Sequence, residues 1–226
     1  KSAFSLPATI NLMSYNPLTV LANGSATAAE KSVALKVQTA SQQVGNVIIQ
    51  VANVADIVSP GATLQSAAAA VTVALAKAVI DASNSTGGTI NLADSATVGL
   101  IIQAAFTATG ATTTAAQVAQ IAHVTAANNA AAASATSITQ LAQAADVAQG
   151  SATNALIAGA NSNNFGSADA GFSGSSLTTA IDAVTVGSIA PGVALPPTAA
   201  QNTAAAAAAA GAAASALAAP TATLAY

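Results

Sequence analysis

A run of small apolar residues spaced three and four apart is the feature that most constrains this fold. The run steps by 3, 4, 3, 4, 3 and 4 residues through Val37, Ala40, Val44, Val47, Val51, Val54 and Val58. This spacing is the repeat of a helix that buries one narrow face. Thr27 and Glu30 form a capping-box pattern before the run, and Ser59-Pro60-Gly61 follows it. The sequence therefore predicts a helix of about 32 residues that ends near Val58 and is about 48 Å long.

Apolar residues with the same helical spacing recur through the rest of the first two thirds of the chain. They predict a short helix over residues 17–22 and longer helices over about 63–83, 95–108 and 112–149. Asn16 and Asp94 stand where helix N-caps are expected, and Gly110 stands where the helix over 95–108 should end. Valine, isoleucine and threonine favour strands, but the observed spacing does not match the two-residue period of a strand. The sequence therefore predicts an all-α fold, a bundle of long antiparallel helices with alanine and valine seams.

The C-terminal third of the chain has a different composition. Residues 150–174 are rich in Gly, Ser and Asn and are expected to be irregular. A short helix is expected over 177–184, and three prolines within 186–197 indicate a linker. Residues 199–219 are low-complexity polyalanine with high helix propensity. The predicted organisation is a helical bundle at 1–150, an irregular linker-like segment with one short helix at 151–198, and a polyalanine helix and tail at 199–226.

Charge is scarce, and this excludes several classes of function. Charged residues make up 5% of the chain, against about 25% in a typical soluble domain, and the net charge is −3 without any arginine. Nucleic-acid binding needs a basic face that displaces counterions, so no nucleic-acid partner is expected. The absence of cysteine excludes disulfides, thiolate nucleophiles and Cys-ligated zinc. Residues 203–220 form a weakly polar run, but alanine is too weakly apolar for us to expect a membrane span there.

Few ionisable side chains are available for chemistry. His123 has no acidic residue three or four positions away, which favours an isolated histidine over a general base or a ligand. Asp94 is interpreted as a helix cap and Asp146 as a solvated helix position. Asp56 lies near the end of its helix, where the helix dipole disfavours an acid, and Lys77 is its candidate partner across the bundle. No catalytic residue, cofactor-binding residue or metal ligand is assigned, and the chain is not expected to be an enzyme.

Oxygen-bearing side chains gather near the expected irregular segment. Asp169 and Asp182 accompany Asn161, Asn163 and Asn164 there. A calcium site needs six to eight oxygen ligands. The chain has no D-x-D-x-D-G loop and no G-G-x-G-x-D repeat, so calcium stays a candidate partner without a supporting motif.

A distinctive lead-in precedes the first long helix. It reads Ser5-Leu6-Pro7 and then Asn11-Leu12-Met13-Ser14-Tyr15-Asn16-Pro17-Leu18, and an Ala-rich stretch follows from Ala26 to Val51. Over about residues 5–160 the chain resembles an Ala-rich helical segment of very large secreted bacterial surface proteins, which carry cadherin-like, immunoglobulin-like or RTX-type repeats elsewhere. The resemblance implies export to the cell surface and an adhesive, matrix or fibre role for the parent protein. It implies no catalytic residues.

The helices are expected to bury small side chains, alanine and valine, and to expose uncharged faces. Together these two features point to a structural role. Burying an alanine contributes far less than the roughly 1.5–3 kcal/mol of a larger aliphatic side chain, so a bundle with such seams gains stability from partners along its length. Faces of Ser, Thr, Asn and Gln lack the charge that keeps proteins apart. We therefore expect a non-catalytic structural module or subunit of a secreted bacterial surface assembly, such as a fibre, a surface layer or an adhesin stalk. Its expected partners are copies of itself or other domains of a larger protein.

Two other structural classes stay open as alternatives. Ala- and Thr-rich flat faces are typical of ice-binding proteins, although threonine does not recur here at a fixed eleven-residue spacing. The alanine block 204–210 is typical of silk-like proteins, although a single block is not an array. The abrupt opening Lys1-Ser2-Ala3-Phe4 leads us to expect that Lys1 is not a natural translation start.

Overall fold

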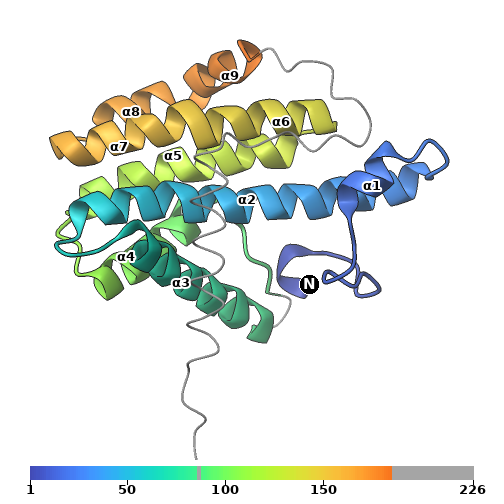
Figure 1. The fold of residues 1–226 in the computed structure, drawn as a ribbon, viewed down its shortest axis with the longest axis horizontal. Coiled ribbons are helices and arrows are strands. Elements are labelled where there is room, and N and C mark those ends of the chain that lie inside the picture. Colours follow the sequence, from blue (N-terminus) through green and yellow to red (C-terminus); the bar gives the residue numbers. More distant parts are fainter. Residues whose placement is uncertain (86–87, 185–226) are drawn as a thin grey trace, which may run out of the picture.

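The computed structural model describes residues 1–85 and 88–184, and within them it holds helices and no strands (Figure 1). The α-helices are α1 (Pro17–Ala22), α2 (Ala28–Val58), α3 (Leu64–Asn84), α4 (Ser95–Thr109), α5 (Ala115–Ser134), α6 (Ile138–Val147), α7 (Thr153–Ser162), α8 (Gly166–Gly171) and α9 (Gly174–Asp182). A 3-10 turn covers Ser2–Phe4, and a π-helical turn over Ala148–Ala152 joins α6 to α7. The predicted all-α bundle is confirmed.

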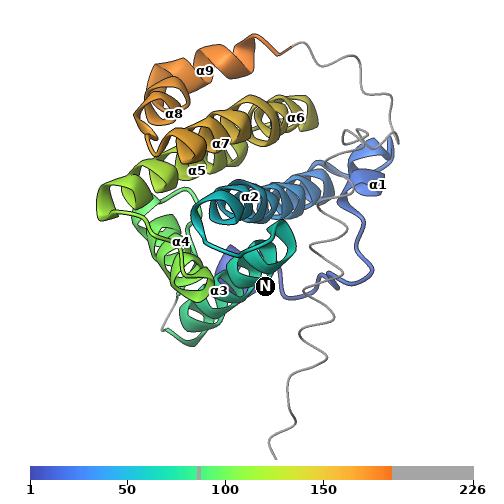
Figure 2. The same ribbon diagram turned by 60° about the vertical axis from the view of Figure 1, so that its left-hand side comes forward.

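The long helix α2 lies in the middle of the molecule. Figures 1 and 2 show α3 and α4 on one side of it and α5 to α9 on the other. α2 packs directly against α3, α5 and α7, while α4 also packs against α5. The main core therefore surrounds α2.

The valine spacing of α2 predicted its buried face correctly. Val47, Val51 and Val54 are fully buried in the main core. Val37 is buried in a second, smaller cluster with Leu6 and Ile10 of the N-terminal segment. One helix face thus covers two separate groups of apolar side chains, which explains why the spacing persists over its whole length.

Most helix ends follow from local capping, as the sequence predicted. The Thr27 amide donates to the Glu30 carboxylate at 2.7 Å, and the Glu30 amide donates to the Thr27 hydroxyl at 3.2 Å. This capping box begins α2. Gly110 ends α4 with a φ of 71°, in the left-handed region where glycine is favoured. Short-range chemistry of this kind can be read from sequence because both partners lie within one helical turn.

The prediction of one long helix over 112–149 is wrong, because the chain breaks between α5 and α6. Ala135 has extended backbone, with φ −63° and ψ 126°. The Gln140 amide donates to the Ser137 hydroxyl at 3.2 Å, and Gln140 Oε1 accepts from the Thr136 amide at 2.8 Å. Thr136 and Ser137 therefore cap the start of α6, and these hydrogen bonds compete with the continuation of α5 into α6 as one helix.

The prediction of irregular structure over 150–174 is also wrong. Leu156 of α7 and Phe165, just before α8, are fully buried in the main core. A Cβ at Gly159 would lie 2.8 Å from the Phe165 ring, so glycine there allows the ring to pack against α7. Gly159 thus allows close packing, and the segment is part of the helical core instead of a linker. The expected short helix is present as α9, which begins earlier than predicted, while the linker over 186–197 and the polyalanine at 199–226 lie outside the described residues.

One helix in the described part of the chain, α3, has the length and apolar composition of a membrane span. Core helices of soluble proteins meet the same criterion. Its inner face is buried in the main core through Ala67, Ala68, Val71, Ala74 and Leu75. α3 is therefore apolar on a packed face and also carries apolar residues outside that face.

Replacing Leu156 with alanine tests whether α7 belongs to the core. We expect Leu156→Ala to lower the free energy of unfolding by about 2–5 kcal/mol, because it leaves a cavity in a packed site. Chemical denaturation monitored by circular dichroism gives the value. The matched control is Leu100→Ala on α4, where the side chain is exposed. Equal effects of the two changes would contradict the placement of Leu156.

Candidate functional site

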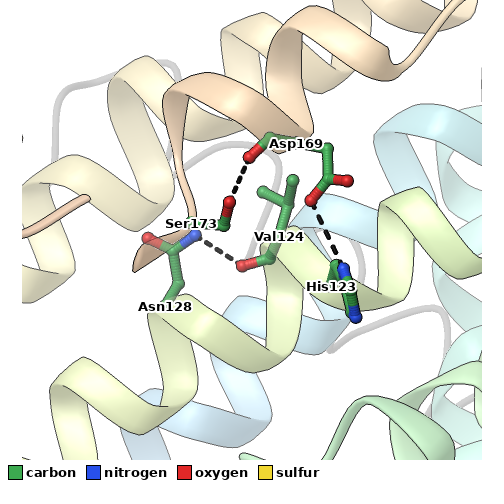
Figure 3. A network of polar contacts seen from close by, with 5 residues as sticks. All are labelled: His123, Val124, Asn128, Asp169 and Ser173. Atoms are coloured by element: carbon green, nitrogen blue, oxygen red, sulfur yellow. Dashed lines mark hydrogen bonds and ion pairs between the residues drawn. The ribbon is translucent and has the colours of Figure 1, made fainter. Parts of the chain in front are cut away.

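His123 and Asp169 meet where α8 packs on α5 (Figure 3). His123 Nδ1 lies 3.5 Å from Asp169 Oδ1, and the two side chains are 62% and 27% exposed. The prediction of an isolated histidine is therefore wrong. Its partner comes from a helix far along the sequence, which a search of neighbouring positions does not reach.

The polar cluster around His123 links helices but does not form a nucleophile relay. A serine nucleophile requires its hydroxyl to donate to the imidazole that activates it. The Ser173 hydroxyl instead donates to the backbone carbonyl of Asp169. The Asn128 amide group donates to the Val124 carbonyl within α5 at 2.8 Å. Figure 3 shows these contacts side by side, with Ser173 turned to the α8 backbone.

Two buried oxygens near His123 accept no hydrogen bond in the described structure, Asn128 Oδ1 and Asp169 Oδ1. A buried carboxylate oxygen is costly unless it is paired, and the His123 imidazole is the group that faces it. When the imidazole is protonated, the pair joins α8 to α5 electrostatically.

The other acidic candidates occupy separate places. Asp94 caps α4, as predicted, and Asp146 is an exposed helix position, as predicted. Lys77 Nζ lies 2.6 Å from Asp81 Oδ2, one turn along α3. The predicted Asp56–Lys77 pair is therefore wrong, because Lys77 finds an acid on its own helix.

The three candidate calcium amides each have their own partner. Asn163 Oδ1 accepts from Gln117 Nε2 at 2.6 Å, and Asn164 Oδ1 accepts from the Gly166 amide at 3.0 Å. Asn161 donates to the Ile157 carbonyl at 3.0 Å. In the part of the chain that the structure describes, no three His, Asp or Glu side chains gather as metal ligands. Hydrogen bonds within the protein therefore account for the positions of these three asparagine side chains.

A buried group of amides, which the sequence analysis missed, lies between α2 and α5. We call Asn46, Gln50, Asn128 and Asn129 the amide cluster; all four are at most 1% exposed. Asn46 Nδ2 donates to Asn129 Oδ1 at 3.1 Å, and Asn129 Nδ2 donates to the Leu92 carbonyl at 2.9 Å. Gln50 Nε2 donates to the Ala148 carbonyl at 2.8 Å. The cluster therefore ties α2 and α5 to the segment before α4 and to the π-helical turn.

A sequence signal for the amide cluster does exist. Gln43, Asn46, Gln50 and Asn53 recur at intervals of 3, 4 and 3 beside the valine seam. Their spacing places them on one helix face, and burial of two of them shows that this face turns inward. From the sequence, we expect uncharged polar faces to contact other proteins, whereas these amides contact other helices of the same chain.

The outer face of α3 is an exposed apolar surface. Val73 is 67% exposed and Ile80 is 58% exposed. Seven residues separate them, so both lie on one face of the helix. We call Val73, Ile80 and the exposed Ala76 between them the α3 outer face. The nearby charges Lys77 and Asp81 pair with each other.

Comparison of the chain with models of protein families, with curated proteins and with solved structures found no match to any of them. The resemblance to secreted bacterial surface proteins stays a prediction.

Disrupting the amide cluster should cost stability. Asn129→Ala leaves Asn46 Nδ2 and the Leu92 carbonyl without their partner, at about 1–3 kcal/mol for each buried group. A double-mutant cycle with Asn46→Ala should give a coupling energy of about 0.5–3 kcal/mol. Denaturant unfolding measures both quantities, and Gln103→Ala, an exposed amide on α4, is the control. Additive effects would show that Asn46 and Asn129 act independently.

Asp94 should make stability depend on pH in the acid range. Hydrogen bonds from the Thr97 hydroxyl and amide, at 2.8 and 2.9 Å, lower the pKa of Asp94 below its ordinary 3.8. A lowered pKa favours the folded state above the ordinary pKa, and this contribution is lost as pH falls through the folded-state pKa. Thermal unfolding of the wild type and of Asp94→Asn, a neutral cap, should therefore converge as pH falls from 6 towards 2. A melting-temperature difference that stays constant over this range would contradict the expectation.

Proposed function

We propose that this chain is a non-catalytic structural module of a secreted bacterial surface assembly, and that it associates with copies of itself through uncharged helix faces. The observation that carries the proposal is the α3 outer face, where Val73 and Ile80 stand in solvent. Exposed branched aliphatic side chains aligned on one face are a feature of surfaces that are covered by a partner.

Association through this face is physically reasonable in size. Removing apolar surface from water contributes about 25 cal/mol per Å². α3 has 21 residues and is about 32 Å long. A specific interface buries more than about 1000 Å² in total, so the contact would have to take in the length of α3 and the adjoining surface of α4.

Low charge favours contact between copies. The charged residues of the whole chain amount to 5%, and on α3 Lys77 and Asp81 neutralise each other. Repulsion between two approaching α3 faces is therefore small. Small side chains such as Ala76 also let two helices approach closely.

The non-catalytic part of the proposal rests on the His123 cluster. Ser173 donates to a backbone carbonyl, and Asp169 supports the contact between α8 and α5. The secreted, bacterial part rests on the resemblance of the lead-in over residues 5–18 and of the Ala-rich stretch behind it.

The test is the oligomeric state of the protein in solution. Wild-type protein should form oligomers that grow with concentration in sedimentation velocity. The double change Val73→Lys and Ile80→Lys should shift the population towards monomer, because it places two charges in the contact. Circular dichroism should show the same helical content, since both side chains are exposed.

A matched control separates the face from the added charge. Asn154→Lys with Ala158→Lys adds the same charge to exposed positions of α7, which lies on the other side of α2 from α3. This variant should still assemble. A wild-type monomer at every concentration, or equal weakening by the two double variants, would overturn the proposal.

A further inference from the structure

A large groove runs beside the N-terminal half of α2. It has a volume of about 1020 Å³. One wall is α2, the second is the N-terminal segment with residues 89–91, and the third is the connection between α5 and α6. The groove lies away from the α3 outer face, which does not line it.

The charged side chains that line this groove in the described chain are positive. Lys31 and Lys36 line it, and within the described chain its lining includes no Asp or Glu. Neither lysine forms an ion pair with a described residue, unlike Lys77, which pairs with Asp81. Glu30, the adjacent acid in sequence, is turned towards Thr27 in the capping box. The groove thus holds two uncompensated positive charges in a chain whose net charge is −3.

Uncharged polar groups line the same groove on all three walls. Ser32, Thr39 and Gln43 come from α2. Asn91 and Thr136 come from the other two walls. Gln43 Nε2 donates to the Asn129 carbonyl and the Thr136 hydroxyl donates to Gln140 Oε1, so these two side chains offer their oxygens to a ligand as acceptors. Hydroxyl and amide groups of this kind both donate and accept hydrogen bonds, as sugar hydroxyls do. The chemistry of the lining therefore matches a ligand that carries anionic groups and many hydroxyls.

We infer that this groove binds an acidic polysaccharide, with Lys31 and Lys36 contacting its carboxylates. The two lysines are five residues apart, which corresponds to about 7.5 Å along the helix axis. Five residues also turn the helix by about 140°, so the two lysines reach a chain in the groove from its two sides and can contact separate anionic groups. An extended acidic peptide is less well matched, because the described residues offer no strand edge for backbone pairing.

Calorimetry with polygalacturonate oligomers at low salt tests this inference. Wild-type protein should bind them, and it should not bind the neutral polysaccharide dextran. Lys31→Gln and Lys36→Gln should each weaken binding, and the double variant should weaken it by about tenfold or more. Raising the salt concentration should weaken binding by the wild type, since both lysines lie at the surface of the groove.

The control is Lys77→Gln, which removes the same charge from a lysine outside the groove. It should bind polygalacturonate like the wild type, and circular dichroism should show that every variant is folded. No binding by the wild type, equal weakening by Lys77→Gln and Lys36→Gln, or equally tight binding of polyglutamate would overturn the inference. The inference does not rest on self-association, because the groove and the α3 outer face share no residue.

Discussion

The hydrogen bond between Asn46 and Asn129 is the contact that defines how this bundle packs. Seams of alanine and valine are nearly interchangeable from one turn to the next, so apolar packing alone distinguishes neighbouring registers poorly. A buried amide has partners in one register and loses them in any other, at a cost of about 1–3 kcal/mol per group. Because Asn129 also binds the Leu92 carbonyl, the same contact places the start of α4. We infer that polar contacts select the alignment and that apolar burial stabilises it.

The sequence predicts interactions between residues that are close together in the chain better than interactions between residues that are far apart in it. The starts of α2 and α4 were predictable because Thr27 and Asp94 act within one turn of their own helices. The pairing of His123 with Asp169 was not, because it depends on how α8 folds back onto α5. The same reason applies to residues 150–174, whose composition resembles a loop until Phe165 is seen to pack against Gly159.

The few charges of this chain are arranged differently on the two proposed surfaces of the molecule. On the α3 outer face, Lys77 and Asp81 cancel and leave Val73 and Ile80 to determine what the surface contacts. In the groove beside α2, Lys31 and Lys36 have no acid to cancel them. A few charges in a nearly neutral chain therefore have large local effects. A module that associates through one face and binds acidic glycans in a separate groove would suit a cell-surface assembly.

The π-helical turn between α6 and α7 has a consequence for how this chain tolerates changes of length. A π-helical turn holds an extra residue compared with an α-helical one, and its Ala148 carbonyl accepts from both Gln50 and Thr153. Deleting that one residue would restore a regular α-helix in nearly the same rotational phase, whereas deleting a second residue would rotate everything after it by about 100° about the axis. Leu156 would then turn away from the core. Changes of length between α6 and α7 beyond that one residue are therefore limited by rotational phase, and such changes should be better accepted in the connection between α1 and α2.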